Sequence, residues 1–247
     1  MRSRDKMLSA AAALHLIADS PLQAREPQIR VTRLEPVHSN VCHLETERSS
    51  GDSRTGSAML FENRYLLTAG HNLMQDWTKI RSIKVRCGVM DAKGAPVQRE
   101  VEAWQTLIAD KFEPWRFYPK RHDFGVIRLA EPIQTDSPIR LARSVAGKGE
   151  RVCLFGYPGD GLGGYTLHRG CAPVVGPAFF DKGIEYDLTT YRSNSGGPVL
   201  REAPDGSWEL VAIHIQPSSG RQVDDSYTKE IRRLMRKLDE RAIGRTR

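Results

Sequence analysis

The chain of 247 residues lacks the patterns that mark metal sites, membrane spans and phosphate-binding loops. Its four cysteines include no Cys-x-x-Cys pair and its seven histidines are scattered, which argues against a structural zinc site. No run of eighteen apolar residues occurs, so we expect no membrane-spanning helix. The glycines between residues 156 and 164 are not followed by the Gly-Lys-Ser/Thr of a phosphate-binding loop. We therefore expect a soluble globular protein without a metal or other cofactor.

The N-terminal region differs from the rest. Three basic residues precede the mostly apolar residues 7–18, as in a secretory signal, but His15 interrupts the apolar run. An amphipathic helix, a propeptide and a transit peptide are the alternatives. We treat residues 1–30 as a signal, propeptide or extension, and we lean toward a secreted or extracytoplasmic location.

Two of the cysteines flank a turn-rich segment. Cys153 and Cys171 lie on either side of residues 156–164, which contain five glycines and a proline. A hairpin centred on that segment would bring the two cysteines nearly opposite each other, close enough for a disulfide. Two buried free thiols are the alternative interpretation.

Most of the chain has the pattern of β-structure. Short apolar or alternating runs are separated by turn residues, as in residues 57–61, 65–68, 124–129, 152–155 and 210–215. Glu62 and Asn63 are suited to a tight hairpin turn between the first two runs. Residues 130–149 carry prolines and polar residues, so we place the connection between two subdomains there.

The C-terminal segment has helical periodicity instead. Apolar residues at 231, 234, 235, 238 and 242 form one stripe, and we predict a helix over residues 227–242. Residues 227–247 also carry eight Lys and Arg against three Asp and Glu, which accounts for most of the chain's formal charge of +7. The apolar stripe is explained if the helix packs against the protein core, and the charge is explained if the opposite face of the helix is exposed to solvent. Binding of a nucleic acid or of an anionic membrane by the basic face is the sharper alternative. Without a nucleic-acid motif or interleaved aromatic residues, we do not expect a nucleic acid; an acidic partner bound at this helix is a further alternative.

Three short blocks carry the residues of nucleophilic catalysis. Ser195 lies in "SNSGGPV", ahead of an apolar strand. The two glycines that follow it have no side chains, so we expect that another molecule can approach the backbone closely there; an ordinary turn is the alternative interpretation. A serine hydroxyl becomes a nucleophile when an imidazole takes its proton and a carboxylate orients that imidazole. His71 follows a strand in "LLTAGH", and Asp123 precedes one in "DFGVIRL". Loop ends on a rigid β-scaffold commonly present reactive groups.

The order His71, Asp123, Ser195 and the three blocks together resemble the trypsin-like serine proteases of the chymotrypsin fold. The segments "GYPGD", "YDLTT" and "AIH", with the C-terminal helix, resemble the glutamyl endopeptidase branch. The resemblance spans residues 35–240. It implies an all-β fold of two six-stranded antiparallel barrels followed by a C-terminal α-helix. Within a peptidase domain of residues 31–247, barrel one would cover about 31–135, barrel two about 150–226, and the helix 227–242.

The resemblance also implies residue roles for the hydrolysis of peptide bonds in a protein or peptide substrate. Ser195 would attack the carbonyl carbon, His71 would act as base and then acid, and Asp123 would stabilise the imidazolium. The backbone N–H groups of Ser193 and Ser195 would form the oxyanion hole. Thr190 and His214 match positions that contact an acidic side chain before the cleaved bond, and Arg192 could add charge, so cleavage after Glu or Asp is expected.

Four residues depart from the family pattern. Ser193 stands where glycine is usual, Arg192 replaces a small residue, and Pro217 removes an N–H from the run after His214. These departures motivate an alternative function, a catalytically weak or inactive protease-fold protein that binds an acidic partner. Asn194 replaces the aspartate that pairs with a newly freed N-terminus in the digestive enzymes, so this chain cannot form that ion pair.

Overall fold

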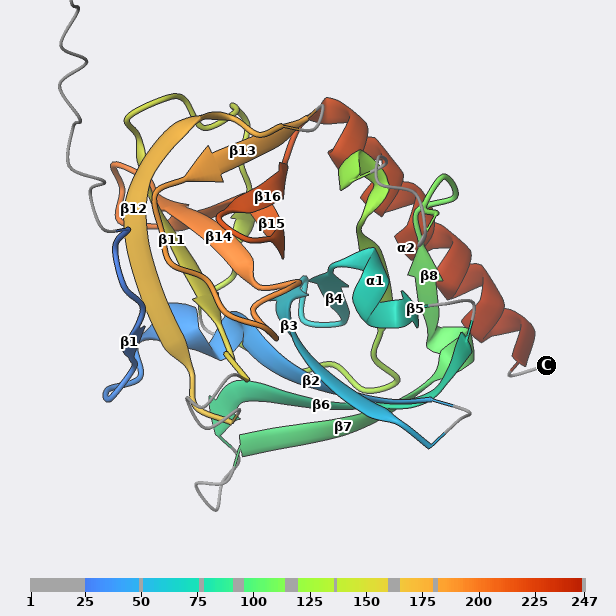
Figure 1. Ribbon diagram of the computed structural model, residues 1–247. Helices are drawn as coiled ribbons and strands as arrows, with labels where there is room; N and C mark the ends of the chain where they lie inside the picture. Colours follow the sequence, from blue (N-terminus) through green and yellow to red (C-terminus); the bar gives the residue numbers. More distant parts are fainter. Residues whose placement is uncertain are drawn as a thin grey trace, which may run out of the picture.

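The computed structural model describes residues 25–48, 51–75, 78–90, 96–113, 120–135, 137–159, 165–179 and 182–245. The predicted signal or propeptide falls largely on residues 1–24, which lie outside the described residues. The described chain is mostly β-structure with one long C-terminal helix, arranged as two curved sheets (Figure 1).

The first sheet is an open, strongly curled antiparallel sheet. Its strands hydrogen-bond in the order β5-β6-β2-β3-β4-β9-β8, and β7 pairs with β6. Within the described residues its two ends do not pair with each other, so it forms a curled half-barrel where a closed six-stranded barrel was expected. The strands are β2 (Val41–Arg48), β3 (Ser53–Phe61), β4 (Tyr65–Thr68), β5 (Met74–Gln75), β6 (Thr78–Met90), β7 (Pro96–Glu102), β8 (Thr106–Ile108) and β9 (Gly125–Arg128).

The second sheet closes on itself. The strand β12 pairs with both β11 and β13, which completes a six-stranded ring in the order β12-β11-β14-β15-β16-β13. Two short strands, β1 and β10, join its outside at β12 and β15. The strands are β1 (Ile29–Arg30), β10 (Arg140–Leu141), β11 (Arg151–Gly156), β12 (His168–Pro177), β13 (Gly183–Tyr186), β14 (Pro198–Glu202), β15 (Trp208–Gln216) and β16 (Ser219–Gln222).

These features confirm the expected chymotrypsin-like architecture, with an open first sheet. The remaining elements are a short helix between β4 and β5, three 3-10 turns and the long helix. They are α1 (Gly70–Leu73), η1 (Pro36–Asn40), η2 (Ala103–Gln105), η3 (Lys120–His122) and α2 (Asp225–Arg245). The helix α2 is longer at both ends than the predicted range.

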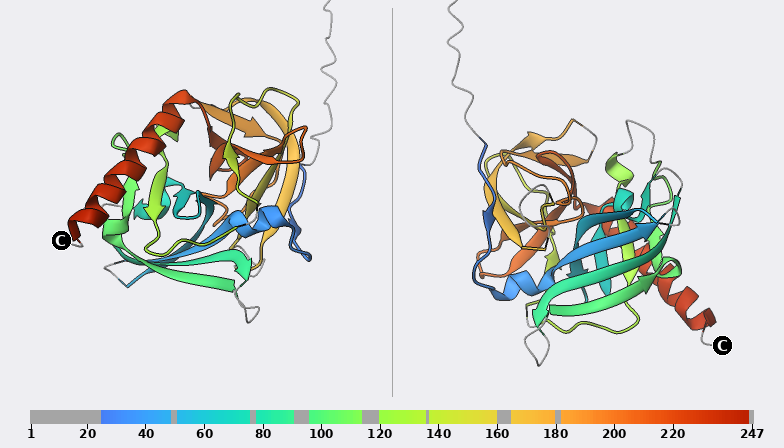
Figure 2. Two further views of the ribbon diagram at one scale, coloured as in Figure 1. Left: turned by 180° about the vertical axis from the view of Figure 1, so that it is seen from behind. Right: turned by 60° about the horizontal axis from the view of Figure 1, so that its bottom comes forward.

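Three apolar clusters hold the sheets. One lies inside the first sheet around Leu66 and Ile127, and another inside the second around Val199 and Val211. The third lies between the sheets and beneath α2, and it includes Val126, Phe155 and Ile231. Alternating side chains on β9 explain this division, because Val126 and Ile127 point to opposite faces of the same strand. The helix α2 crosses the outside of β8 and β9, with its apolar stripe buried (Figures 1 and 2).

Much of the positive charge of α2 is balanced within the chain. Arg232 pairs with Glu62, and Arg233 and Lys237 lie within 4.0 Å of carboxylates, including that of Asp110. These ion pairs connect α2 with the β3–β4 turn and with the loop after β8. No helix within the described residues is long and apolar enough to cross a membrane.

Two local features of the sequence have clear structural counterparts. The turn between β3 and β4 has positive φ at Glu62 (49°) and Asn63 (58°), and it pairs Phe61 with Tyr65. Cys153 and Cys171 lie directly opposite each other on β11 and β12 and form a disulfide. Cys42 and Cys87 form a second disulfide between β2 and β6, a pairing that was not predicted from the sequence.

Candidate active site

The pairing of β4 with β9 brings His71 and Asp123 together. Thr68 at the end of β4 lies opposite Gly125 at the start of β9. His71 follows the first of these strand ends and Asp123 precedes the second, so both side chains emerge at one edge of the sheet. The Nδ1 atom of His71 lies 2.8 Å from Oδ2 of Asp123, and the His71 amide donates to Oδ1 at 2.9 Å. Both carboxylate oxygens therefore orient the histidine.

Asp123 remains a carboxylate despite its burial. Only 2% of the residue is exposed. Burial alone would raise its pKa, but the charge of His71 and the hydrogen bonds from the His71 ring and amide outweigh it, and the pKa lies below its ordinary value. A buried anion beside Nδ1 favours the tautomer whose proton sits on Nδ1, which leaves the Nε2 lone pair available.

Ser195 opens onto the same cavity as His71. The cavity holds about 880 Å³, and its lining also includes Arg192 and Ser193. Within the described residues the Ser195 hydroxyl forms no hydrogen bond, so it is not yet bonded to the His71 ring. Catalytic hydrogen bonds are often long or misaligned before substrate binds.

A polar network fixes the Ser195 backbone to the first sheet. The Ser195 carbonyl accepts from the Ser57 amide at 2.9 Å and from the Asn72 side chain at 2.7 Å. The same Asn72 amide group donates to Thr68 at 2.9 Å, whose hydroxyl donates to the Ser57 carbonyl at 2.7 Å. Neither Ser57 nor Asn72 was among the site residues predicted from the sequence; the only available signal was that Asn72 follows His71.

The two glycines after Ser195 serve internal packing. A Cβ atom at Gly196, where φ is +86°, would lie 2.1 Å from the Ser57 carbonyl oxygen. A Cβ at Gly197 would lie 2.4 Å from the Phe155 carbonyl oxygen. The sequence suggested that these glycines admit another molecule; the structure shows that they admit the protein's own backbone.

The oxyanion-hole candidates, Ser193 and Ser195, have backbone amides that form no hydrogen bond with other described residues. Ser193 has a φ of +67°, a left-handed conformation that glycine normally adopts. Its hydroxyl lies 2.6 Å from the Thr55 hydroxyl, and its carbonyl accepts from Ser57 at 2.8 Å. The Arg192 carbonyl accepts from the Gly159 amide at 2.9 Å. Within the described part of the chain, the amides of Ser193 and Ser195 donate to no other group.

The specificity candidates differ in exposure. His214 is 2% exposed, and its Nδ1 forms a hydrogen bond with the buried Tyr186 hydroxyl. Burial first, and then the nearby His71, lower the pKa of His214 to about 3, so it is neutral at physiological pH. Thr190 is half-buried, and its hydroxyl accepts from the Ser218 amide at 3.1 Å. Arg192 is exposed and lines the cavity.

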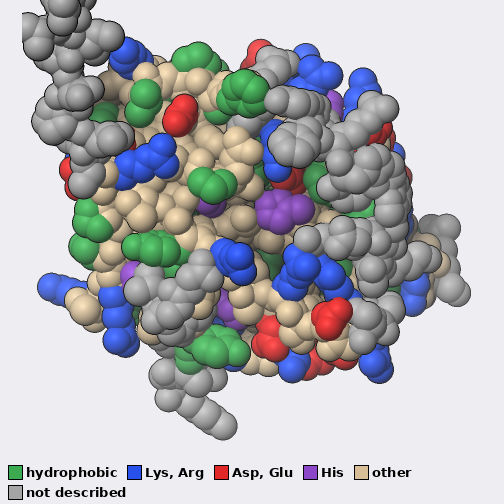
Figure 3. Space-filling view, in the orientation of Figure 1, with side chains coloured by type: hydrophobic (Ala, Val, Ile, Leu, Met, Phe, Trp, Pro, Cys, Tyr) green, Lys and Arg blue, Asp and Glu red, His purple; other side chains and the backbone are tan. Residues whose placement is uncertain are grey.

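The cavity has a positive rim. Among the described residues, its lining contains three arginines, Arg48, Arg54 and Arg192, against one acid, Glu45. In the space-filling view, histidine surface is visible near the middle of this face, with Lys and Arg surface close by (Figure 3). The described residues contain no group of three His, Cys, Asp or Glu side chains arranged for a metal ion.

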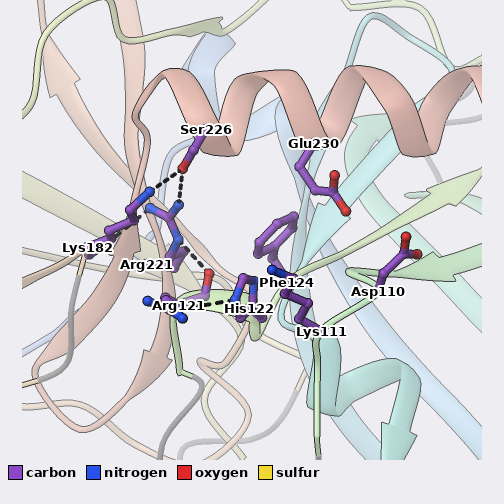
Figure 4. A pocket seen from close by; sticks show the side chains of 9 residues that line it. All are labelled: Asp110, Lys111, Arg121, His122, Phe124, Lys182, Arg221, Ser226 and Glu230. Atoms are coloured by element: carbon purple, nitrogen blue, oxygen red, sulfur yellow. Dashed lines mark hydrogen bonds between the residues drawn. The ribbon is translucent and has the colours of Figure 1, made fainter.

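A buried arginine braces the loop before Asp123 from the other barrel. Arg221 on β16 is 2% exposed, and its Nε donates to the Arg121 carbonyl at 2.7 Å. Its remaining N–H groups reach the Lys182 and Gln222 carbonyls and the Asp224 carboxylate. One of them also reaches the Ser226 hydroxyl (Figure 4). A cavity of about 390 Å³ lies beside this cluster. Arg221, which lines it, already uses all its N–H groups in hydrogen bonds within the protein. Arg221 was not predicted as a site residue, because nothing in the sequence distinguishes it from other basic residues on strands.

Comparisons with known proteins identify the family and the fold of this chain. Residues 56–213 match the family described as "Trypsin-like peptidase domain". Among solved structures, a Glu endopeptidase in complex with MPD is similar, with a TM-score of 0.64 and 16% sequence identity. The match covers 84% of this chain and 96% of that one.

Proposed function

This chain belongs to the family of trypsin-like peptidase domains, and from that premise we propose that it is a serine endopeptidase whose triad is His71, Asp123 and Ser195. The observation that carries the proposal is the pair of hydrogen bonds from His71 to Asp123, 2.8 Å from the ring and 2.9 Å from the amide. They orient the ring beside the cavity that Ser195 lines.

The chemistry proceeds in two proton-coupled halves. His71 Nε2 takes the proton of the Ser195 hydroxyl while Oγ bonds to the peptide carbonyl carbon. The imidazolium then gives that proton to the departing amine as the C–N bond breaks. Water, deprotonated by the same imidazole, attacks the acyl-enzyme, and the proton returns to Ser195 as the acid product leaves. Asp123 stays ionised throughout and stabilises the imidazolium.

The developing negative charge on the substrate oxygen needs two donors. The amides of Ser193 and Ser195 fill this role, because neither donates elsewhere in the described residues and the Arg192 carbonyl is bonded to Gly159. Each such donor contributes about 3–4 kcal/mol to the transition state.

We further propose cleavage after Glu or Asp. Arg192 adds positive charge at the cavity, and the Thr190 hydroxyl can still donate. Because His214 is neutral, it would act on a carboxylate as a hydrogen-bond donor, with no formal charge. The similar solved structure is named as a Glu endopeptidase.

A fluorophosphonate probe tests the catalytic part. The wild-type protein should be labelled, Ser195→Ala should not, and Asp123→Asn should lose about 10⁴-fold in kcat. A folded wild type that neither labels nor turns over substrate would favour the alternative, a binding protein for an acidic partner.

Paired substrates test the specificity part. Peptide esters with Glu before the cleaved bond should be hydrolysed faster than the matched Lys esters. Arg192→Gln should reduce the ratio of the Glu-ester rate to the Lys-ester rate by a factor of about ten or less. Arg140→Gln is the control, since Arg140 pairs with the exposed Asp205 and does not line the cavity. Equal turnover of Glu and Lys esters by the wild type would contradict the proposed specificity but not the proposed triad.

A further inference from the structure

The segment before β1 lies against residues 187–190, a stretch that includes the specificity candidate Thr190. Glu26 donates from its amide to the Asp187 carbonyl at 3.1 Å, and its carbonyl accepts from the Thr189 amide at 2.8 Å. Arg25 bonds to the Ser218 hydroxyl. The chain then continues as β1, which adds to the outer edge of β12 (Figures 1 and 2). Residues 25–28 are thus a strap along the 187–190 segment.

One side chain of this strap points inward. Gln28 is 8% exposed, and its Nε2 donates to the Thr189 carbonyl and to Oδ1 of Asn194, both at 3.1 Å. The Asn194 Nδ2 lies 3.4 Å from Oε1 of Gln28 in return. Both N–H groups of the Gln28 amide are used, and the two amide groups face each other in a buried pair.

Asn194 lies between the two residues whose amides would form the oxyanion hole. It has no exposed surface, and its Oδ1 also accepts from the Tyr191 amide at 2.9 Å. That contact closes the turn of residues 191–194 around the left-handed Ser193. Gln28 is the only described side chain that donates to Asn194 from outside this turn.

We infer that Gln28 is a positioning residue for the oxyanion hole, and that residues 25–28 belong to the catalytic apparatus. Without Gln28, Asn194 Oδ1 keeps one donor, and its Nδ2 loses the only acceptor that the described residues provide. Buried polar groups without partners are costly, so the turn would rearrange to satisfy them. The amides of Ser193 and Ser195 would then point away from the position of the oxyanion. This inference rests on the proposed function, because it concerns the same site.

The variant Gln28→Met tests the inference, since methionine keeps the length of the side chain and removes its hydrogen bonds. We expect kcat on an ester substrate to fall about 10- to 100-fold while KM changes little, because misplaced donors weaken binding of the transition state more than that of the substrate. Fluorophosphonate labelling should slow by the same factor.

Gln105→Met is the matched control. Gln105 is also buried, at 3% exposed, and its Nε2 likewise donates to a backbone carbonyl, that of Arg128 at 2.8 Å. It should lose thermal stability and keep the wild-type kcat. Equal kcat losses in both variants, or a wild-type kcat in Gln28→Met, would overturn the inference.

A second variant keeps the test decisive if Gln28→Met does not fold. Gln28→Glu preserves shape but has no donor when ionised, and one donor when protonated. Its labelling rate relative to wild type should therefore rise as the pH is lowered; a pH-independent ratio near one would contradict the inference. Inactivity of the wild type would overturn the proposed function and this inference with it, whereas an active wild type with an unaffected Gln28→Met would overturn only the inference.

The active species supplies an independent readout. Intact-mass measurement of the fluorophosphonate adduct should find only chains that retain Gln28. A labelled chain that begins after residue 28 would show that the strap is dispensable.

Discussion

The side-chain amide of Asn72 donates a 2.7 Å hydrogen bond to the carbonyl oxygen of Ser195. The residue next to the proposed base therefore holds the residue proposed as nucleophile, although 123 positions separate Asn72 from Ser195. Asn72 lies in α1, which follows β4 of the first sheet, and Ser195 lies in the loop before β14 of the second sheet. Both residues line the cavity, so this bond links two of its walls.

Asn72→Ala should uncouple the two loops. The Ser195 carbonyl and the Thr68 hydroxyl would each lose a donor, at a cost of about 1–3 kcal/mol in the free energy of unfolding. The kcat should fall about tenfold or more, because the hydroxyl and the imidazole lose their mutual alignment. Asn40→Ala is the control: Asn40 donates to the Ser137 carbonyl at 2.6 Å, away from the cavity, so stability should fall with kcat unchanged. Identical kcat in Asn72→Ala and wild type would contradict the coupling.

Ser193→Gly should retain activity. Glycine removes the left-handed strain of about 1–2 kcal/mol but also loses the bond to Thr55 and gains freedom in the unfolded chain, so the net change in unfolding free energy should stay within about 1 kcal/mol. Ser193→Val should lower both stability and kcat, because a β-branched residue tolerates positive φ poorly. Steady-state kinetics and urea unfolding on both variants check this; equal behaviour of the two would argue against a left-handed residue 193.

His43→Phe should reduce the dependence of the free energy of unfolding on pH in the acidic range. His43 is buried, its Nε2 has no partner within the described residues, and burial, followed by the charge of Arg86, lowers its pKa to about 4. Between pH 6.5 and 4 the unfolded chain binds a proton that the folded chain does not, so stability is full above pH 6.5 and falls as the pH is lowered. The slope is about 1.4 kcal/mol per pH unit for this one group.

Phenylalanine keeps the ring contacts of His43 with Tyr157 and Tyr165 and removes the proton site. Urea unfolding at several pH values from 7 to 4.5 should give a shallower slope in the variant. Parallel slopes would show that His43 is protonated in the folded state.

Reduction of the disulfides should lower the thermal midpoint. Cys42–Cys87 closes a separation of 45 residues and Cys153–Cys171 one of 18, so loss of the cross-links should cost about 4 and about 3 kcal/mol respectively. Calorimetry of Cys42→Ala/Cys87→Ala and of Cys153→Ala/Cys171→Ala measures each contribution separately. Alkylation that modifies all four cysteines in the unreduced, denatured protein would contradict both pairings.

The sequence alone determined the fold class and the local setting of each chemical block. Apolar alternation specified strands, helical spacing specified α2, and Glu62-Asn63 specified a tight turn, because these signals act over a few residues. The family resemblance of the three blocks indicated the chymotrypsin-like fold. The sequence did not predict that the first sheet stays open, since closure depends on pairing between strands distant in the chain.

Only the tertiary structure decided what supports the candidate site. Asn72, Arg221 and Gln28 have no distinguishing local pattern, because their partners lie 123, 100 and 166 positions away. Gly196 looked like a point of access for another molecule and is instead packed against the first sheet. The residue type determines which hydrogen bonds a side chain can form, but the packing of the two sheets determines which group becomes its partner.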